Sequence, residues 1–140
     1  MPALDRYHNA VRNALSKDGW AITANPLTVY VGLRRVHIDT ALERLLTAEQ
    51  QGRKIAVEVK SFTGLSPVAD LEGAVGQIAL YNAVLAEVEP DRFLYLAVPV
   101  AVYESILEEP LGLIARKHIL QRIVTFDPEL EEVVLWNPLP

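Results

Sequence analysis

Two charged residues, Glu58 and Lys60, stand two positions apart in the run KIAVEVKSF at residues 54–62. Side chains alternate between the two faces of a strand, so in an extended chain Glu58 and Lys60 share one face. The residues that point to the other face are all aliphatic: Ile55, Val57 and Val59. The pattern indicates either a strand with one solvated face or a buried strand that carries a polar site.

A second carboxylate, Asp39, follows the β-type alternation of residues 36–38, and that run could pair beside the strand that contains Glu58. Hard divalent cations such as Mg²⁺ take oxygen ligands, usually one or two carboxylates with water and substrate phosphate. Asp39 and Glu58 would suit Mg²⁺ or Mn²⁺, with the main-chain carbonyl of Val59 as a further ligand. Such a metal activates water and polarises a phosphoryl oxygen, and the Lys60 ammonium can orient that water. The chemistry favoured is phosphodiester hydrolysis.

Gln77 and Tyr81 are four residues apart in the run GQIALYNAVL, so they lie on one face of a helix. That face borders an apolar stripe that should face the core, traced by Val68, Leu71, Val75, Ile78 and Leu85. The pair is therefore either the polar shoulder of a buried helix, or it reaches over the end of the sheet towards Glu58 and the metal.

Other titratable side chains are secondary candidates. Histidines are most simply surface or boundary residues, although His37 shares a strand face with Asp39 and His8 could face the sheet from the first helix. Glu43 and Glu49 are spare carboxylates, of which Glu43 is the better second-tier ligand. The basic groups that could contact phosphate are Arg34–Arg35, Arg53–Lys54 and Arg116–Lys117, the last extended by His118.

The elements that must position these residues follow from hydrophobic periodicity. Helices are predicted over residues 3–17 and 67–87, and over 103–118 with an interruption at Pro110. Strands are predicted over residues 20–23, 27–31, 36–39, 54–62 and 92–99, with a closing hairpin of 121–126 and 131–136. Residues 41–50 suit either a short helix or a strand that turns at Gln51-Gly52. This order predicts an α/β (α+β) fold, in which helices flank a mixed β-sheet.

Local signals support the two longest helices. Gly19 stands where an αL cap would end the first helix, and Ser66 with Pro67 is typical of a helix start. Gly73 and Gly76 lie inside the long helix, where they form no phosphate loop, and we expect them to permit close backbone packing.

Composition excludes several function classes. A chain of 140 residues with 51% hydrophobic residues suits one globular domain, 1–140. It has no cysteine, which removes disulfides and thiolate chemistry. The formal net charge of −5 gives no overall attraction to nucleic acid, so a local patch or a partner must supply the positive field. No apolar run is long enough to span a membrane, and the start lacks the stretch of a signal peptide, so we expect a soluble, cytoplasmic protein.

Asp39, then Glu58-x-Lys60, then Gln77 and Tyr81 together resemble the PD-(D/E)XK nuclease superfamily, whose core runs helix, three strands, helix, strand (αβββαβ). The Gln-x-x-x-Tyr spacing is similar to that of its RecB-like members. The resemblance implies that Asp39 and Glu58 are metal ligands, that Lys60 is the catalytic lysine, and that Gln77 and Tyr81 are auxiliary site residues. This chain departs from the superfamily pattern in having no proline before Asp39.

A narrower resemblance covers nearly the whole chain. The runs MPALDRYHNAVRNALSKDGW, KIAVEVKSF, GQIALYNAVL, LYLAVP and VVLW closely resemble the XisH family of cyanobacterial fdxN element excision controlling factor proteins. This implies a role in programmed excision of a DNA element during heterocyst differentiation, beside a site-specific recombinase and a small companion protein. The family implies either an Mg²⁺- or Mn²⁺-dependent endonuclease-like protein that acts on DNA, or a catalytically silent regulator that binds the recombinase or the companion. A homodimer is a further alternative.

Overall fold

A six-stranded mixed sheet forms the centre of the molecule, a computed structural model that describes residues 6–23 and 46–140. The strands lie in chain order: β1 (Ala21–Thr23), β2 (Leu46–Gln50), β3 (Arg53–Val59), β4 (Arg92–Pro99), β5 (Ile123–Asp127) and β6 (Glu132–Asn137). The central pairs β3–β4 and β4–β5 are parallel, and the outer pairs are antiparallel. The predicted mixed α/β fold is confirmed.

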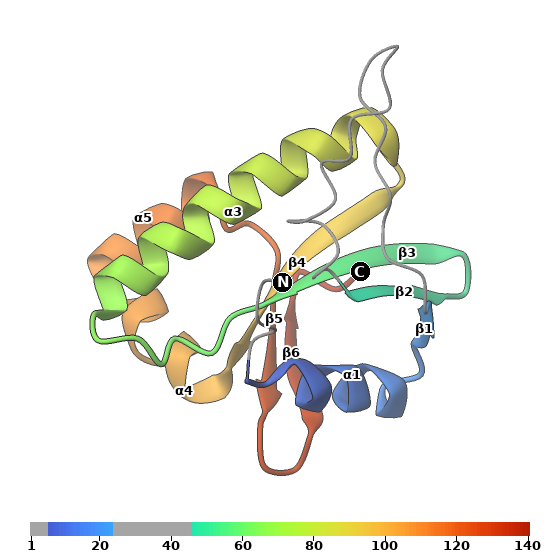
Figure 1. Ribbon diagram of the computed structural model, residues 1–140, viewed down its shortest axis with the longest axis horizontal. Helices are drawn as coiled ribbons and strands as arrows, with labels where there is room; N and C mark the ends of the chain where they lie inside the picture. The colour runs from blue at the N-terminus through green and yellow to red at the C-terminus, as the bar shows by residue number, and fades with distance from the viewer. Residues whose placement is uncertain (1–5, 24–45) are drawn as a thin grey trace.

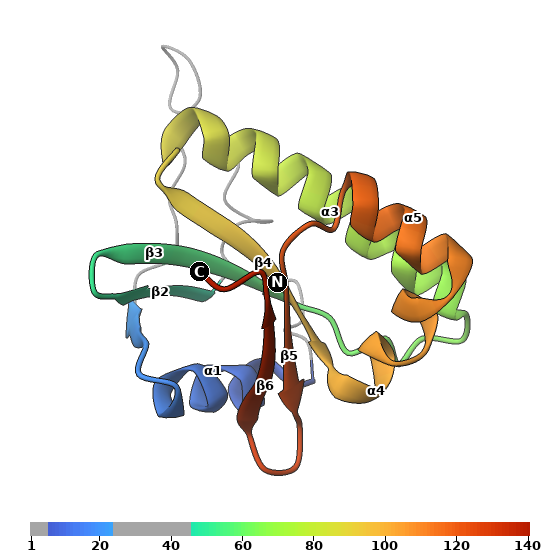
Figure 2. The same cartoon turned by 180° about the vertical axis from the view of Figure 1, so that it is seen from behind.

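Helices cover both faces of this sheet, as Figure 1 shows and Figure 2 repeats from behind. The helical elements are α1 (His8–Lys17), α3 (Pro67–Val88), α4 (Val100–Tyr103), the 3₁₀ turn η1 (Ile106–Glu108) and α5 (Pro110–His118). Helix α1 lies on one side of the sheet, and α3 crosses the other side. Among the described residues, no helix is both long and apolar enough to cross a membrane.

The alternation of β3 divides the buried side chains between the two faces. Ile55 and Val57 pack on the α1 side, in a cluster with Leu15 and Phe126. Ala56 packs on the α3 side with residues of that helix and of β4. Glu58, two residues after Ala56, therefore points to the α3 side of the sheet.

Backbone geometry explains how the ambiguous segment before β3 folds. Gln51 (φ 50°) and Gly52 (φ 78°) both adopt positive φ, which is the signature of a two-residue hairpin turn. Residues 46–50 are consequently strand β2, as one of the two sequence alternatives held. The remaining predicted runs of this region, residues 27–31, 36–39 and 41–45, lie outside the described residues.

Helix α3 begins and ends close to the predicted residues. The Ser66 hydroxyl accepts a hydrogen bond from the Ala69 N–H at 3.2 Å, and Pro67 is the first helical residue. One expected core position was wrong: Val68 is 42% exposed, while Ala74 and Tyr81 take buried positions instead. The reason is that α3 meets the sheet only beyond its first turn.

The two glycines of α3 do not serve the expected packing. A Cβ atom built at Gly73 or at Gly76 meets no described atom within 4 Å. The prediction that they allow another part of this chain to approach the helix is therefore wrong for the part of the chain that the structure describes. Both glycines stand on the exposed surface of α3.

Candidate functional site

Glu58 is a buried carboxylate in the centre of the sheet. It is the second-last residue of β3, lies opposite Leu96 of β4, and is 3% exposed. The residues around it on this face, Ala56 and Leu96, belong to the apolar cluster under α3. Removing an uncompensated carboxylate from water costs roughly several kcal/mol. The burial of Glu58 therefore requires a compensating partner or a functional reason.

Lys60 supplies the compensating charge from the same strand face. Its main-chain N–H donates to the Ala97 carbonyl at 3.0 Å, which prolongs the pairing with β4 one residue past Val59. Its Nζ lies 3.5 Å from Glu58 Oε1, and the lysine side chain is 25% exposed against 4% for the glutamate. The predicted side-by-side placement is confirmed, and the ammonium is the part of the pair that faces solvent.

Gln77 and Tyr81 come from the middle of α3, on the side of the sheet to which Glu58 points. Tyr81 is 2% exposed and belongs to the apolar cluster that contains Ala56. Gln77 is half-buried, and its Oε1 atom is buried without a hydrogen-bond partner among the described residues. The amide oxygen of Gln77 is thus an acceptor that this part of the fold leaves unused.

The segment after Lys60 contains a non-glycine residue at positive φ, a feature that sequence reasoning missed. The predicted strand over 54–62 was wrong beyond Val59, because Phe62 adopts φ 57° and its ring packs against the α3-side cluster. A bulky residue at positive φ costs about 1 kcal/mol or more. Such strain recurs at functional sites. The one sequence signal for this conformation was an aromatic residue, Phe62, two positions after the charged pair.

The second predicted metal ligand, Asp39, lies outside the described residues, as do His37, Glu43 and the pair Arg34–Arg35. Its convergence with Glu58 therefore stays a prediction. Within residues 6–23 and 46–140, no group of three or more His, Asp or Glu side chains is placed to hold a metal. Among the described residues of the site, Glu58 alone supplies a carboxylate oxygen of the kind that a hard cation takes, and such a cation needs only one or two carboxylates.

Several secondary candidates lie away from this site. His8 belongs to α1, on the opposite face of the sheet, and His118 is exposed at the end of α5. Arg116 is engaged within the fold, since it donates to the Leu107 carbonyl at 3.2 Å and to the Tyr103 hydroxyl at 2.7 Å. These residues give no support to a phosphate contact beside Glu58.

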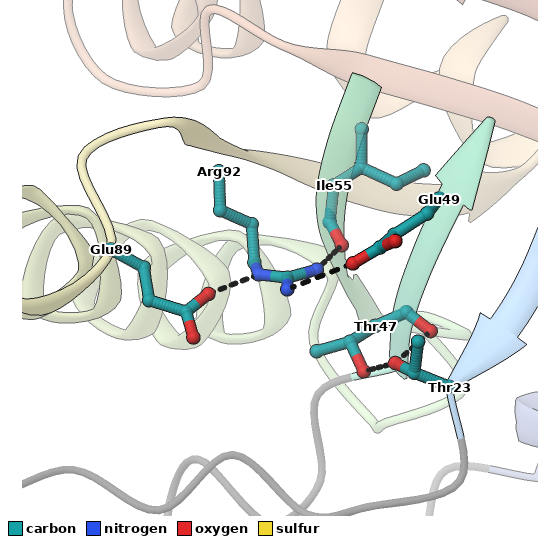
Figure 3. A network of polar contacts seen from close by, with 6 residues as sticks. All are labelled: Thr23, Thr47, Glu49, Ile55, Glu89 and Arg92. Atoms are coloured by element: carbon teal, nitrogen blue, oxygen red, sulfur yellow. Dashed lines mark hydrogen bonds and ion pairs between the residues drawn. The ribbon is translucent and has the colours of Figure 1, made fainter. Parts of the chain in front are cut away.

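The remaining candidates, Glu49 and the pair Arg53–Lys54, lie at the other end of the sheet, near Arg92. Figure 3 shows Arg92 between three acceptors: Glu89, Glu49 and the Ile55 carbonyl. The Arg92 Nη2–Glu49 Oε1 distance is 3.8 Å and the Nη1–Ile55 O distance is 2.9 Å. Because these residues start β3 and β4 while Lys60 follows the end of β3, they form a separate cluster.

The fold and the polar pair define a class of protein: a mixed α/β domain with a buried carboxylate and a lysine at the carboxyl end of a central strand. The chain belongs to the XisH family, since the family model described as XisH protein matches residues 1–134. This confirms the family resemblance that the sequence motifs carry. The comparison with curated proteins gave no match.

Two solved structures are similar over almost their whole length. An XisH family protein from Nostoc punctiforme PCC 73102 is 38% identical with a TM-score of 0.81, and the match covers 95% of this chain and 99% of that one. An fdxN element excision controlling factor protein from Anabaena variabilis is 40% identical with a TM-score of 0.78, and the match covers 94% and 97%. These identities extend the likeness from fold to family.

Proposed function

We propose that this protein is a metal-dependent endonuclease-like phosphodiesterase that acts on DNA during element excision. The observation that carries the proposal is the buried Glu58 carboxylate, held 3.5 Å from the Lys60 ammonium on the sheet face that packs against the apolar α3-side cluster. Such an arrangement is typical of functional sites, because a pair serving stability alone gains little after desolvation. The similarity to an fdxN element excision controlling factor protein supports DNA as the substrate.

Glu58 would bind Mg²⁺ or Mn²⁺ together with Asp39 and the carbonyl of Val59, in the manner of the PD-(D/E)XK superfamily. The bound metal would supply a Lewis acid for a phosphoryl oxygen and a more acidic water. Glu58 is fixed for this task by its strand and by the apolar cluster around it. Its second function is to hold the Lys60 ammonium at the edge of the site.

Lys60 would orient the attacking water and offset charge that grows on the phosphate. Its partly exposed side chain can reach a substrate that Glu58, at 4% side-chain exposure, cannot meet directly. The unused Gln77 Oε1 would accept a hydrogen bond from a water of the same site, and Tyr81 would fix the depth of α3 over the sheet.

The test is cleavage of branched and linear DNA with Mg²⁺ or Mn²⁺, by the protein alone and with its companion excision factor. Glu58→Gln and Lys60→Ala should each lower the cleavage rate by ~100-fold or more, since even residues behind a metal ligand affect activity by about 10–100-fold. Mn²⁺ should raise the melting temperature of the wild type and not that of Glu58→Gln, which gives a readout independent of turnover.

Matched controls come from the other end of the same strands. Glu49→Gln and Lys54→Ala remove the same charges from residues that face each other across β2 and β3. These two variants should cleave at the wild-type rate. Equal cleavage by Glu58→Gln and the wild type would exclude the proposed site, and absence of cleavage in every assembly would exclude the activity.

A second candidate function is a regulatory role through binding of a recombinase or the companion protein, and the outer surface of α3 favours it. Exposed residues of this helix are mainly small or apolar: Gly76, Ala79, Leu80, Ala83 and Ala86. Leu80 is 54% exposed, and the helix contains neither Lys nor Arg. Such a surface is unsuited to phosphate but suits a protein partner. Stable copurification with the companion, without cleavage by the complex, would favour this role.

A further inference from the structure

A pocket of about 240 Å³ opens beside Lys60, between the end of β3 and the first two turns of α3. Its lining includes Lys60, Ser61, Thr63, Asp70 and Gly73. The volume is below the ~300–1,000 Å³ of sites for drug-sized ligands, so the pocket fits a fragment of a longer substrate. Because Lys60 belongs both to this pocket and to the pair with Glu58, the two are continuous.

The polar groups of the pocket are of two kinds. The segment after β3 contributes Lys60 and the Ser61 and Thr63 hydroxyls, whose oxygens lie 3.1 Å apart. An ammonium and a hydroxyl are both donors that suit phosphate oxygens, although one of these two hydroxyls donates to the other. Helix α3 contributes the Asp70 carboxylate, which accepts a hydrogen bond from the Gly64 N–H at 3.0 Å. A carboxylate repels a second phosphate and accepts hydrogen bonds from amino groups.

Gly73 leaves the helix wall of the pocket bare. Glycine inside a helix is about 1 kcal/mol less favourable than alanine. A Cβ at Gly73 would meet no described atom within 4 Å, so internal packing does not explain the glycine. Neighbouring wall residues Ala69 and Ala74 are also small. Close approach of a group from outside the described residues to the helix backbone is a physical reason for a glycine here.

We propose that this pocket is a subsite for the nucleotide unit next to the phosphate that the Glu58–Lys60 pair engages. The phosphate of that unit contacts Lys60 and its base contacts Asp70, while the open backbone at Gly73 gives room for the sugar. The proposal rests on the nuclease-like function above and adds to it the place where the DNA strand enters the site.

The test fills the pocket from a position where the fold tolerates a side chain. Gly73→Ala and Gly73→Leu should raise the melting temperature by ~3 °C, since each removes a helix glycine. Gly73→Leu should weaken binding of a fluorescent branched oligonucleotide by ~10-fold or more, and Gly73→Ala should do so less. Binding is measured by anisotropy in a chelating buffer, where no turnover can occur.

Gly76→Ala and Gly76→Leu are the matched controls, because Gly76 is equally open at its Cβ but does not line the pocket. They should stabilise the protein and leave DNA binding unchanged. Wild-type binding by Gly73→Leu overturns the subsite even if Glu58→Gln abolishes cleavage. Equal losses in both Leu variants also overturn it, because they point to contact along the whole outer surface of α3, as with a protein partner.

The two proposals can fail separately. If Glu58→Gln cleaves like the wild type while Gly73→Leu alone loses DNA binding, the nuclease site is wrong and the nucleotide pocket stands. If the wild type binds no oligonucleotide, the pocket proposal is wrong.

Discussion

Two charged clusters lie at opposite ends of the parallel strands β3 and β4, and they differ in whether the cation or the anion is buried. At the amino ends, the Arg92 side chain is 8% exposed, while its partners Glu49 and Glu89 are 45% and 37% exposed. At the carboxyl end of β3, the acid is the buried member, since Glu58 is 4% and Lys60 25% exposed. One end buries a cation among acceptors, and the other buries an anion behind an exposed cation.

The difference shows which cluster is structural. Arg92 meets two carboxylates and a main-chain carbonyl, so its donors tie β2, β3 and the α3–β4 connection together (Figure 3). Lys60 by contrast pairs with Glu58 of its own strand at 3.5 Å and lines a pocket, so this pair ties no separate elements together. The Arg92 end should therefore carry stability, and the Glu58 end should carry function.

The largest effect on stability is expected from Arg92→Met. The loss of its hydrogen bonds to Glu89 and the Ile55 carbonyl, and of its ion pair with Glu49, should lower the free energy of unfolding by about 1–3 kcal/mol, with the exposed glutamates free to regain water. Urea unfolding measures this change. The free energy of unfolding of Arg92→Lys should lie between those of the wild type and Arg92→Met, because lysine keeps the charge but lacks the planar guanidinium group. A change below about 0.5 kcal/mol would break the proposed contrast.

Glu58→Gln should give a smaller change of the opposite sign. The neutral amide has nearly the same shape, and it removes the desolvation of a buried charge while Lys60 can turn to solvent. We expect the free energy of unfolding to stay equal or to rise by up to about 2 kcal/mol, as at sites where function is kept at the expense of stability. A loss of more than about 1 kcal/mol, measured by the same urea unfolding, would mean that this pair is structural too.

The smallest effect concerns Tyr95, on the α1 side of β4. Burial raises the pKa of its phenol, and the nearby Arg122 lowers it by less. The phenol also donates to the Pro138 carbonyl at 2.9 Å. Because the folded pKa lies above the unfolded value of about 10, this contribution is complete below about pH 10 and is lost as pH rises through the folded pKa.

Tyr95→Phe removes the titrating phenol, so the variant is the control for the wild type. The free energy of unfolding should therefore fall more steeply above about pH 10 for the wild type than for the variant. Parallel curves, followed by urea unfolding at several alkaline pH values, would show that Tyr95 is not coupled to folding. The comparison tests whether a buried neutral phenol on the α1 side contributes to stability as Arg92 does.

Much of the fold could be predicted from the sequence because its signals are local. Apolar runs located β3 and β4, the Ser66-Pro67 pair located the start of α3, and the alternation in KIAVEVKSF put Glu58 and Lys60 on one face. The candidate site could be predicted only in part. The placement of Glu58 and Lys60 on one face follows from the two-residue period of a strand. The positive φ of Phe62 and the open space at Gly73 instead depend on contacts between segments that are distant in the sequence.

By itself the sequence determined the family, the mixed α/β class and the adjacency of Glu58 to Lys60, since motifs and strand periodicity are properties of the linear chain. Only the tertiary structure decided that Glu58 is buried, because burial depends on α3 crossing that face of the sheet. The packing of α3 against β4 likewise decided that Gly73 faces open space beside Lys60. The physical reason is that a side chain's face follows from the local backbone, whereas its exposure follows from what the rest of the chain brings against it.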